Sequence, residues 1–158
     1  MPPVPDQPSL LRRLRRLLPG VWLGVLGCVA LIATPAPFAL LAQADAGRVV
    51  GRILGQEAWL SLGLAVALLL LERQRARQAA ERGCGSVLST EMLLVVATLF
   101  CTVAGYFGVQ QMLPAARGGQ GGLSFGQWHG VSVALFGLKG LLVLALAWRS
   151  AGPAGPAD

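Results

Sequence analysis

The chain has 158 residues, of which 54% are apolar and 13% are charged. Soluble domains carry about 25% charged residues, and the apolar residues here are gathered into blocks, so the composition argues against a water-soluble fold. The formal net charge is +6, but the basic residues flank the apolar blocks and form no basic face, which argues against nucleic acid as a partner. The sequence therefore predicts an all-α membrane protein, a bundle of four transmembrane helices in the lipid bilayer.

Three parts are expected along the chain. Residues 1–16 are predicted to form a flexible basic tail, residues 17–149 the transmembrane domain, and residues 150–158 a second flexible tail, because the two ends are rich in proline, glycine or charge. The four helices are expected at about 17–41, 53–72, 87–113 and 125–149.

The first helix contains no charged side chain from residue 21 to residue 39. At ~1.5 Å per residue, a helix of this length can cross ~30 Å of hydrocarbon. Pro35 and Pro37 lie near its outer end. Each proline removes a backbone donor, so we expect a kink or break there that opens a small gap in the bundle.

The second helix must include a polar residue to be long enough. Its uncharged run would rise only ~21 Å as a helix, which is short of the membrane core. Extending the helix backward places Glu57 inside the outer leaflet. Gly47, Gly51 and Gly55 follow one another at intervals of four residues, and this spacing on one helical face predicts close packing against a neighbouring helix.

The third and fourth helices complete the predicted bundle. Residues 92–116 are free of charge, Glu91 lies at their inner edge, and a glycine-rich turn at residues 118–122 follows. The fourth helix carries His129 near its outer end and Lys139 near its middle. Because an ionisable group at membrane depth costs at least ~2.5 kcal/mol on insertion scales, Lys139 is a candidate functional residue.

The basic residues are divided unequally between the two sides of the predicted bundle. The side richer in Lys and Arg is expected to face the cytoplasm. One side holds Arg12, Arg13, Arg15, Arg16, Arg73, Arg75, Arg77, Arg82 and Arg149, and the other holds Arg48, Arg52 and Arg117. Both termini are therefore predicted to be cytoplasmic.

One face of the fourth helix carries three polar side chains. At ~100° per residue, His129, Ser132 and Lys139 fall within one sector and are expected to face the bundle interior. We expect Glu57 to pair with Lys139 or with His129, because an unpaired buried charge is unfavourable. Glu91 is an alternative partner for Lys139. In a purely structural interpretation, Lys139 extends toward the cytoplasm and the polar residues only fix the helix register.

Motifs for soluble-type catalysis are missing from the sequence. It contains no HExxH, GxSxG, P-loop or GxGxxG motif, and its single histidine cannot supply two axial haem ligands. We therefore expect no catalytic residue, no metal site and no cofactor.

Three short motifs carry a resemblance to a known family: residues 34–38 (Thr-Pro-Ala-Pro-Phe), residues 46–52 (Ala-Gly-Arg-Val-Val-Gly-Arg) and residues 125–132 (Phe-Gly-Gln-Trp-His-Gly-Val-Ser). On these motifs the chain resembles bacterial members of the transmembrane protein 205-like family, domain of unknown function 4149. The resemblance covers about residues 20–149 and implies no settled activity. The motif positions that it implies, all toward the non-cytoplasmic side, are Pro35, Phe38, Ala46, Gly47, Phe125, His129, Gly130 and Ser132.

These observations together predict a non-enzymatic protein of the bacterial inner membrane that binds a partner or takes part in transport. Its partners would be the lipid bilayer and either further copies of itself or another membrane protein. Two alternatives stay open: a cofactor- or metal-dependent membrane oxidoreductase, and a metal or cation conduit along the fourth helix. The candidate polar cluster consists of Arg48, Arg52, Glu57, His129, Ser132 and Lys139.

Overall fold

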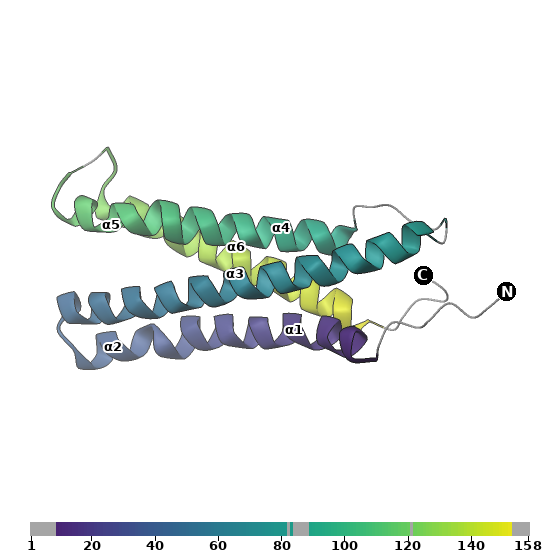
Figure 1. Ribbon diagram of the computed structural model, residues 1–158. Helices are drawn as coiled ribbons and strands as arrows, with labels where there is room; N and C mark the ends of the chain where they lie inside the picture. The colour runs from purple at the N-terminus through teal and green to yellow at the C-terminus, as the bar shows by residue number, and fades with distance from the viewer. Residues whose placement is uncertain (1–8, 82, 84–88, 121, 153–158) are drawn as a thin grey trace.

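The computed structural model describes residues 9–81, 83, 89–120 and 122–152. Within these residues, four helical stretches are long and apolar enough to cross a membrane, and no strand occurs. Four membrane-length helices are what the sequence predicts. Figure 1 shows them lying side by side in one elongated bundle. They run from Leu10 to Leu40, from Gln43 to Gln78, from Thr90 to Arg117 and from Phe125 to Ala151.

Two of the four spans are continuous α-helices and two contain a π-helical segment. The first span consists of α1 (Ser9–Cys28), the π-helix η1 (Val29–Ala33) and α2 (Pro35–Leu40). The second is α3 (Gln43–Glu81). The third consists of α4 (Thr90–Thr102), the π-helix η2 (Val103–Val109) and α5 (Gln110–Arg117), and the fourth is α6 (Phe125–Ala151).

The observed helix ends differ from the predicted ones where charged residues continue a helix beyond its apolar stretch. Residues 9–16, predicted as part of a flexible tail, form the first turns of α1. The second helix is longer at both ends than residues 53–72, because its flanks contain the good helix formers Arg, Gln, Glu and Ala. The third runs past residue 113 to Arg117, and the fourth past residue 149 to Ala151. Outside the described residues lie 1–8 and 153–158 of the two predicted tails and residues 87–88 of the third predicted helix.

Serine caps define where the third and fourth spans begin. The Ser89 hydroxyl accepts a hydrogen bond from the backbone N–H of Met92 at 3.2 Å. Ser124 and Gln127 form a reciprocal capping box, in which each side chain accepts from the other residue's backbone N–H, at 3.3 Å and 2.9 Å. Between these two spans, Gly119 adopts a positive φ of 72° and ends the turn that follows α5.

The predicted kink near the outer end of the first span is a π-helical segment followed by a new helix. The backbone N–H of Thr34 donates to the carbonyl of Val29 at 2.9 Å, a separation of five residues along the chain. Pro35 then occupies the first position of α2. A backbone N–H at this position has no acceptor within the helix, so proline loses no helical hydrogen bond there. The extra residue in this turn rotates α2 about the helix axis and so changes which of its side chains point toward the bundle.

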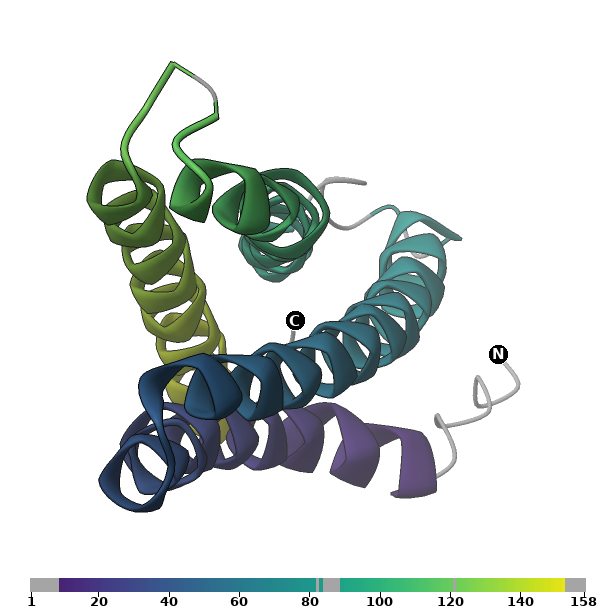
Figure 2. The same ribbon diagram turned by 90° about the vertical axis from the view of Figure 1, so that its left-hand side faces the viewer.

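The four spans are arranged as a ring in the order α1, α3, α4, α6, in which each is in backbone contact with the next and α6 with α1. The ring is closed toward the end at which α1 begins and α6 ends, the inner end of the bundle, and open toward the opposite, outer end. There α2 lies beside α3, and α5 lies beside α6, but no described Cα atom of α5 lies within 8 Å of one in α2 or α3. Figure 2 looks along the bundle from this outer end and shows the two pairs diverging.

The inner half of the bundle is held by a compact apolar core. All four spans contribute to it, and the indole of Trp22 lies fully buried at its centre, with a relative exposure of 0%. Burying an aromatic side chain of this size gives one of the largest apolar contributions available to a single residue. The fully packed members are Trp22, Leu26, Ala65, Leu68, Val95, Val143 and Leu146.

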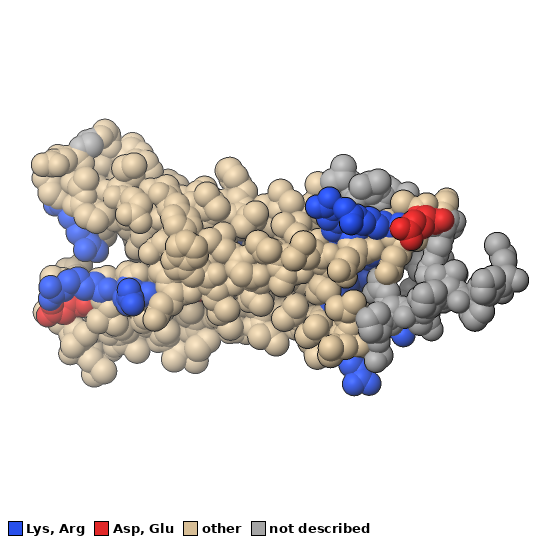
Figure 3. Space-filling model, viewed as in Figure 1, with Lys and Arg blue, Asp and Glu red and all other residues tan. Residues whose placement is uncertain are grey.

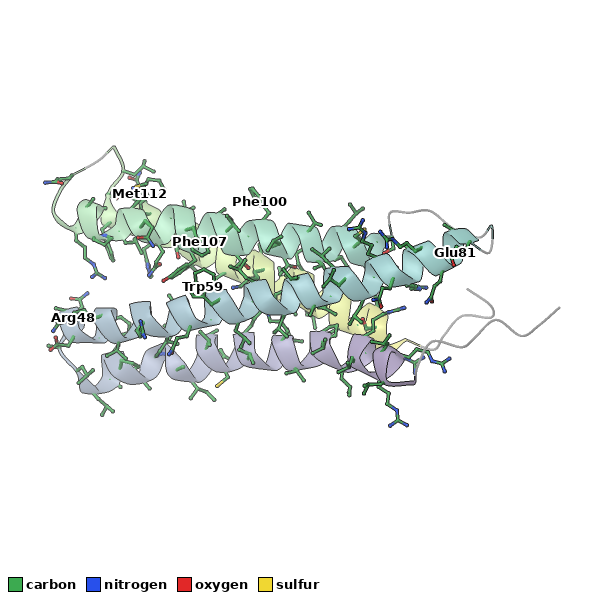
Figure 4. All side chains as sticks on the ribbon, viewed as in Figure 1. Arg48, Trp59, Glu81, Phe100, Phe107 and Met112 are labelled. Carbon is green, nitrogen blue, oxygen red and sulfur yellow. The ribbon has the colours of Figure 1, made fainter. Side chains whose placement is uncertain are left out.

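The outer surface between the two ends is apolar, as a lipid-facing surface must be. Trp59 and Phe100 are 64% and 67% exposed, and Figure 4 shows Phe100 pointing away from the bundle. In Figure 3 the Lys, Arg, Asp and Glu side chains of the visible face gather at the two ends, and the band between them is free of charge. An apolar surface of this extent is expected of a protein solvated by hydrocarbon and not by water.

Candidate functional site: a cavity above a buried ion pair

A buried ion pair connects α3 to α6 near the middle of the bundle. The ammonium nitrogen of Lys139 lies 2.8 Å from Oε1 and 2.7 Å from Oε2 of Glu57. Both side chains are 4% exposed. Of the partners that the sequence leaves open for Lys139, the structure places Glu57 beside it. Glu91 instead forms an ion pair with Arg149 and accepts a hydrogen bond from Arg149 Nε at 2.9 Å.

A serine and a tryptophan extend this pair into a hydrogen-bond chain across three helices. The hydroxyl of Ser61 donates to Glu57 Oε1, and the indole N–H of Trp22 donates to the Ser61 hydroxyl at 2.9 Å. Ser61 is 1% exposed. The Glu57 carboxylate thus accepts three hydrogen bonds, which is what allows a charged pair to remain buried at membrane depth. Ser61 is not among the site residues predicted from the sequence, although its position four residues after Glu57 places both on one helical face.

A cavity of about 1010 Å³ lies above the ion pair, toward the outer end. Its lining includes Glu57 and Lys139, and it includes His129 and Ser132 from the outer half of α6. The volume is at the upper end of the ~300–1,000 Å³ range typical of ligand pockets. Figure 3 shows this end of the molecule hollowed between two groups of basic side chains.

Arg117, the last residue of α5, lies at the mouth of the cavity. Its guanidinium carbon is 4.8 Å from the centroid of the Phe125 ring, and that ring stacks on His129 with a centroid separation of 5.8 Å. The guanidinium also reaches α3, since a Cβ atom added to Gly47 would lie 3.1 Å from one of its nitrogens. Among the described residues, Arg117 has no carboxylate within 4.0 Å. Arg117 is not among the site residues predicted from the sequence, where it counts only among the basic residues that predict the orientation.

Two of the three spaced glycines of α3 accommodate side chains, and a Cβ atom at any of the three would have no second helix backbone among its nearest atoms. A Cβ atom at Gly47 would meet Arg117, one at Gly55 would lie 2.6 Å from the hydroxyl oxygen of Tyr106, and one at Gly51 would meet nothing within 4 Å. The predicted close helix packing along this face is therefore absent within the described chain. Two of the glycines make room for polar side chains that line the cavity.

The remaining predicted site residues are divided between the cavity and the surface. Phe38 and Phe125 line the cavity. Ala46 is fully buried beneath α2, whereas Pro35 and Gly130 are exposed. The structure does not bring Arg48 and Arg52 into the cavity: both are exposed, and Arg48 pairs with Asp45 at the end of the bundle (Figure 4).

Side chains that could hold a metal ion do not come together in the part of the chain that the structure describes. Within it, no group of three His, Cys, Asp or Glu side chains is close enough to coordinate one. Cys101 lines the cavity and Cys28 is exposed on the first span. The ring of His129 stacks on that of Phe125.

Helices that are apolar on the outside and long enough to cross a bilayer, joined inside by buried charges, define a multi-pass helical membrane protein. The sequence profile of one family, described as Domain of unknown function (DUF4149), matches residues 17–120. The chain belongs to this family. The matched region covers most of the first span and all of the second and third, and it ends before α6, so the motif at residues 125–132 lies beyond it. No curated protein and no solved structure matches the chain.

Proposed function

We propose that this protein is a non-enzymatic binding protein of the bacterial inner membrane, related to the transmembrane protein 205-like proteins, that holds a small molecule in its outer cavity. In this proposal both termini are cytoplasmic and the cavity opens on the opposite side. Binding could serve transport of the molecule or its presentation to another membrane protein.

The single observation that carries the proposal is the cavity of about 1010 Å³ with a charged pair at its floor. Buried charges in a membrane protein are unfavourable, and they generally face an interior pathway or site. Here the pair lies at the level where the outer halves of the helices begin to separate. A tightly packed bundle would need no such opening above its polar residues.

Gly51 offers a direct test, because it lines the cavity and an added Cβ there would meet nothing within 4 Å. Gly51→Phe should place a ring in the cavity and obstruct it, without a clash at the new Cβ atom. Gly63→Phe is the matched control: it adds the same side chain to the same helix, at an exposed position that is also free of contacts and outside the cavity lining.

The full chain would be purified in a neutral detergent and released into a native mass spectrometer. We expect a small molecule to remain bound to the wild type and to Gly63→Phe, and to be lost from Gly51→Phe. The same bound mass in all three proteins would place the molecule outside the cavity. A wild type without any bound mass would contradict the proposal as well.

A further inference from the structure

We propose that the ligand of the cavity is an amphiphile with one acyl chain and an anionic head group, a carboxylate or a phosphate, which pairs with Arg117 at the mouth. This inference rests on the proposed function, because it names the chemical class of the molecule that the cavity would bind. Among the described residues, the charge of the lining, the apolar wall and the lateral opening of the cavity favour such a ligand.

The charged side chains that line the cavity leave one positive charge without a partner. Glu57 and Lys139 neutralise each other through two hydrogen bonds. Arg117 also lines the cavity but lies beside no carboxylate among the described residues. A guanidinium presents a planar set of donors that fits a carboxylate or phosphate with two parallel hydrogen bonds. The cavity therefore has the charge that an anionic head group would complement.

Arg117 is also held in place before any ligand binds. Its guanidinium lies over the ring of Phe125, at 4.8 Å from the centroid, and its nitrogens lie against the backbone of α3 at Gly47. Because α5 and α3 have no Cα atoms within 8 Å of each other, this long side chain extends across the mouth between them. A cation fixed by an aromatic face loses less freedom on binding an anion than a mobile surface arginine does.

Below the mouth, the wall of the cavity suits a hydrocarbon chain. It is formed mainly by aliphatic and aromatic side chains, and the Phe136 ring covers Lys139 with its centroid 4.8 Å from the ammonium nitrogen. Each CH₂ group that leaves water for such a surface contributes about 0.8 kcal/mol. The apolar side chains of the lining include Leu54, Leu113, Val133 and Phe136.

The shape of the outer end gives such a molecule a route from the bilayer. The pair formed by α2 and α3 has no Cα atom within 8 Å of α5, and α2 has none within 8 Å of α6. Nearer the middle of the bundle α3 and the third span are in backbone contact, and Trp59 and Phe107 meet there edge to face, with ring centroids 5.6 Å apart. An amphiphile in the outer leaflet would thus meet the cavity from the side, with its head group at the level of Arg117.

The test measures the binding of defined probes to the full chain in neutral detergent by native mass spectrometry. Oleate and oleoyl lysophosphatidic acid supply the two anionic head groups, mono-oleoylglycerol supplies the same chain without charge, and inorganic phosphate supplies a head group without a chain. We expect at least one of the anionic lipids to bind about tenfold more tightly than mono-oleoylglycerol. Inorganic phosphate should not compete with it. The tighter of the two anionic lipids identifies the head group.

Arg117→Gln should remove the preference for the anionic lipid, and Arg117→Lys should keep part of it. The matched control is Arg52→Gln, which removes the same charge from an exposed site at the same end of the bundle but outside the cavity lining. It should bind like the wild type. Melting temperatures of the variants would verify that each remains folded.

Two results would overturn this inference. One is equal affinity of the wild type for the neutral and anionic lipids. The other is an equal loss in Arg117→Gln and Arg52→Gln, which would mean that only the overall surface charge matters. If mono-oleoylglycerol binds as tightly as the anionic lipids and Gly51→Phe abolishes binding of all of them, the cavity binds a ligand but the assigned head group is wrong. If none of the probes binds but a co-purified molecule is still lost from Gly51→Phe, the proposed function stands and the assigned ligand class is wrong. If no bound molecule of any kind responds to Gly51→Phe, the proposed function itself fails.

Discussion

Glu57 and Lys139 form an ion pair between two helices whose backbones do not touch. No described Cα atom of α3 lies within 8 Å of one in α6, yet the two side chains meet at 2.7 Å. The helices lie on a diagonal of the four-membered ring, and the pair crosses the interior between them. The contact therefore connects the two halves of the bundle at the level where they start to diverge.

Removing only the cation should be strongly destabilising. Lys139→Met leaves the Glu57 carboxylate buried without a counter-charge, at a cost of about 3–5 kcal/mol. We expect a clear fall in melting temperature in detergent, measured by tryptophan fluorescence or by loss of soluble protein on heating.

The double variant Glu57→Gln with Lys139→Met is the control for this prediction. It buries no charge, and the amide oxygen of the new side chain can still accept from Ser61. Its melting temperature should lie well above that of Lys139→Met alone. If Lys139→Met melts like the wild type, the ion pair does not contribute to stability.

The contact between Gly55 and Tyr106 predicts a coupled pair of substitutions. A Cβ atom at Gly55 would lie 2.6 Å from the Tyr106 hydroxyl oxygen and 3.3 Å from its Cζ atom, so Gly55→Ala must displace the tyrosine. Removing the hydroxyl with Tyr106→Phe relieves the closer contact. In a double-mutant cycle of melting free energies, we expect a coupling of about 0.5–3 kcal/mol in this direction.

Gly51→Ala supplies the matched control on the same face of α3. A Cβ atom there would meet nothing within 4 Å, so only the higher helix propensity of alanine, about 1 kcal/mol over glycine, remains. This variant should be neutral or stabilising, and its effect should not depend on Tyr106→Phe. Additive effects of Gly55→Ala and Tyr106→Phe would contradict the predicted clash.

Ser61→Ala should test the link from α1 to the ion pair. The substitution removes the acceptor of the buried Trp22 indole N–H and one donor to Glu57. An unsatisfied buried donor costs about 1–3 kcal/mol, so a loss of stability in this range is expected from thermal unfolding. Ser150→Ala is a suitable comparison, because the Ser150 hydroxyl donates only to the carbonyl of Leu146 in its own helix, at 2.8 Å. A similar loss in both variants would argue against a special role for Ser61.

The proposed orientation can be tested with reporters fused to the carboxyl end. The start of α1 and the end of α6 lie at the same end of the bundle (Figure 1), so one fusion reports on both. The positive-inside rule predicts a fluorescent green fluorescent protein fusion and an inactive alkaline phosphatase fusion, because the latter needs an oxidising compartment. The opposite pattern would invert the bundle and place the cavity on the cytoplasmic side.

The number and approximate position of the helices could be predicted because a bilayer requires long apolar stretches. The partner of Glu57 could be narrowed to a few residues, since a buried carboxylate needs a cation and few cations lie at membrane depth. Helical periodicity also placed His129, Ser132 and Lys139 on the face that lines the cavity. These features follow from the local sequence and from the apolar environment of the bilayer.

Features that depend on the angles between helices could not be predicted. Whether the outer ends meet or diverge is decided by packing among all four spans, so the sequence does not reveal the cavity. Arg117 lies far from Gly47 in sequence. Its guanidinium lies beside Gly47 because α5 and α3 are about one long side chain apart at the outer end, and the sequence does not reveal that separation. The glycine spacing was typical of close helix contacts, and the same spacing also leaves room for large side chains. The π-helical segments could not be predicted, because one extra residue in a turn leaves the composition of the helix almost unchanged.

The two π-helical segments, Val29–Ala33 and Val103–Val109, lie in the first and third spans, whose outer parts contribute to the lining of the cavity. Each holds one residue more per turn than an α-helix would. Deleting one residue from the first segment would restore the α repeat and rotate α2 by about 100° relative to α1, which would turn Phe38 away from its present direction. The cavity is thus sensitive to insertions and deletions as well as to substitutions. A relative with identical lining residues but one residue fewer before Pro35 would present a different interior.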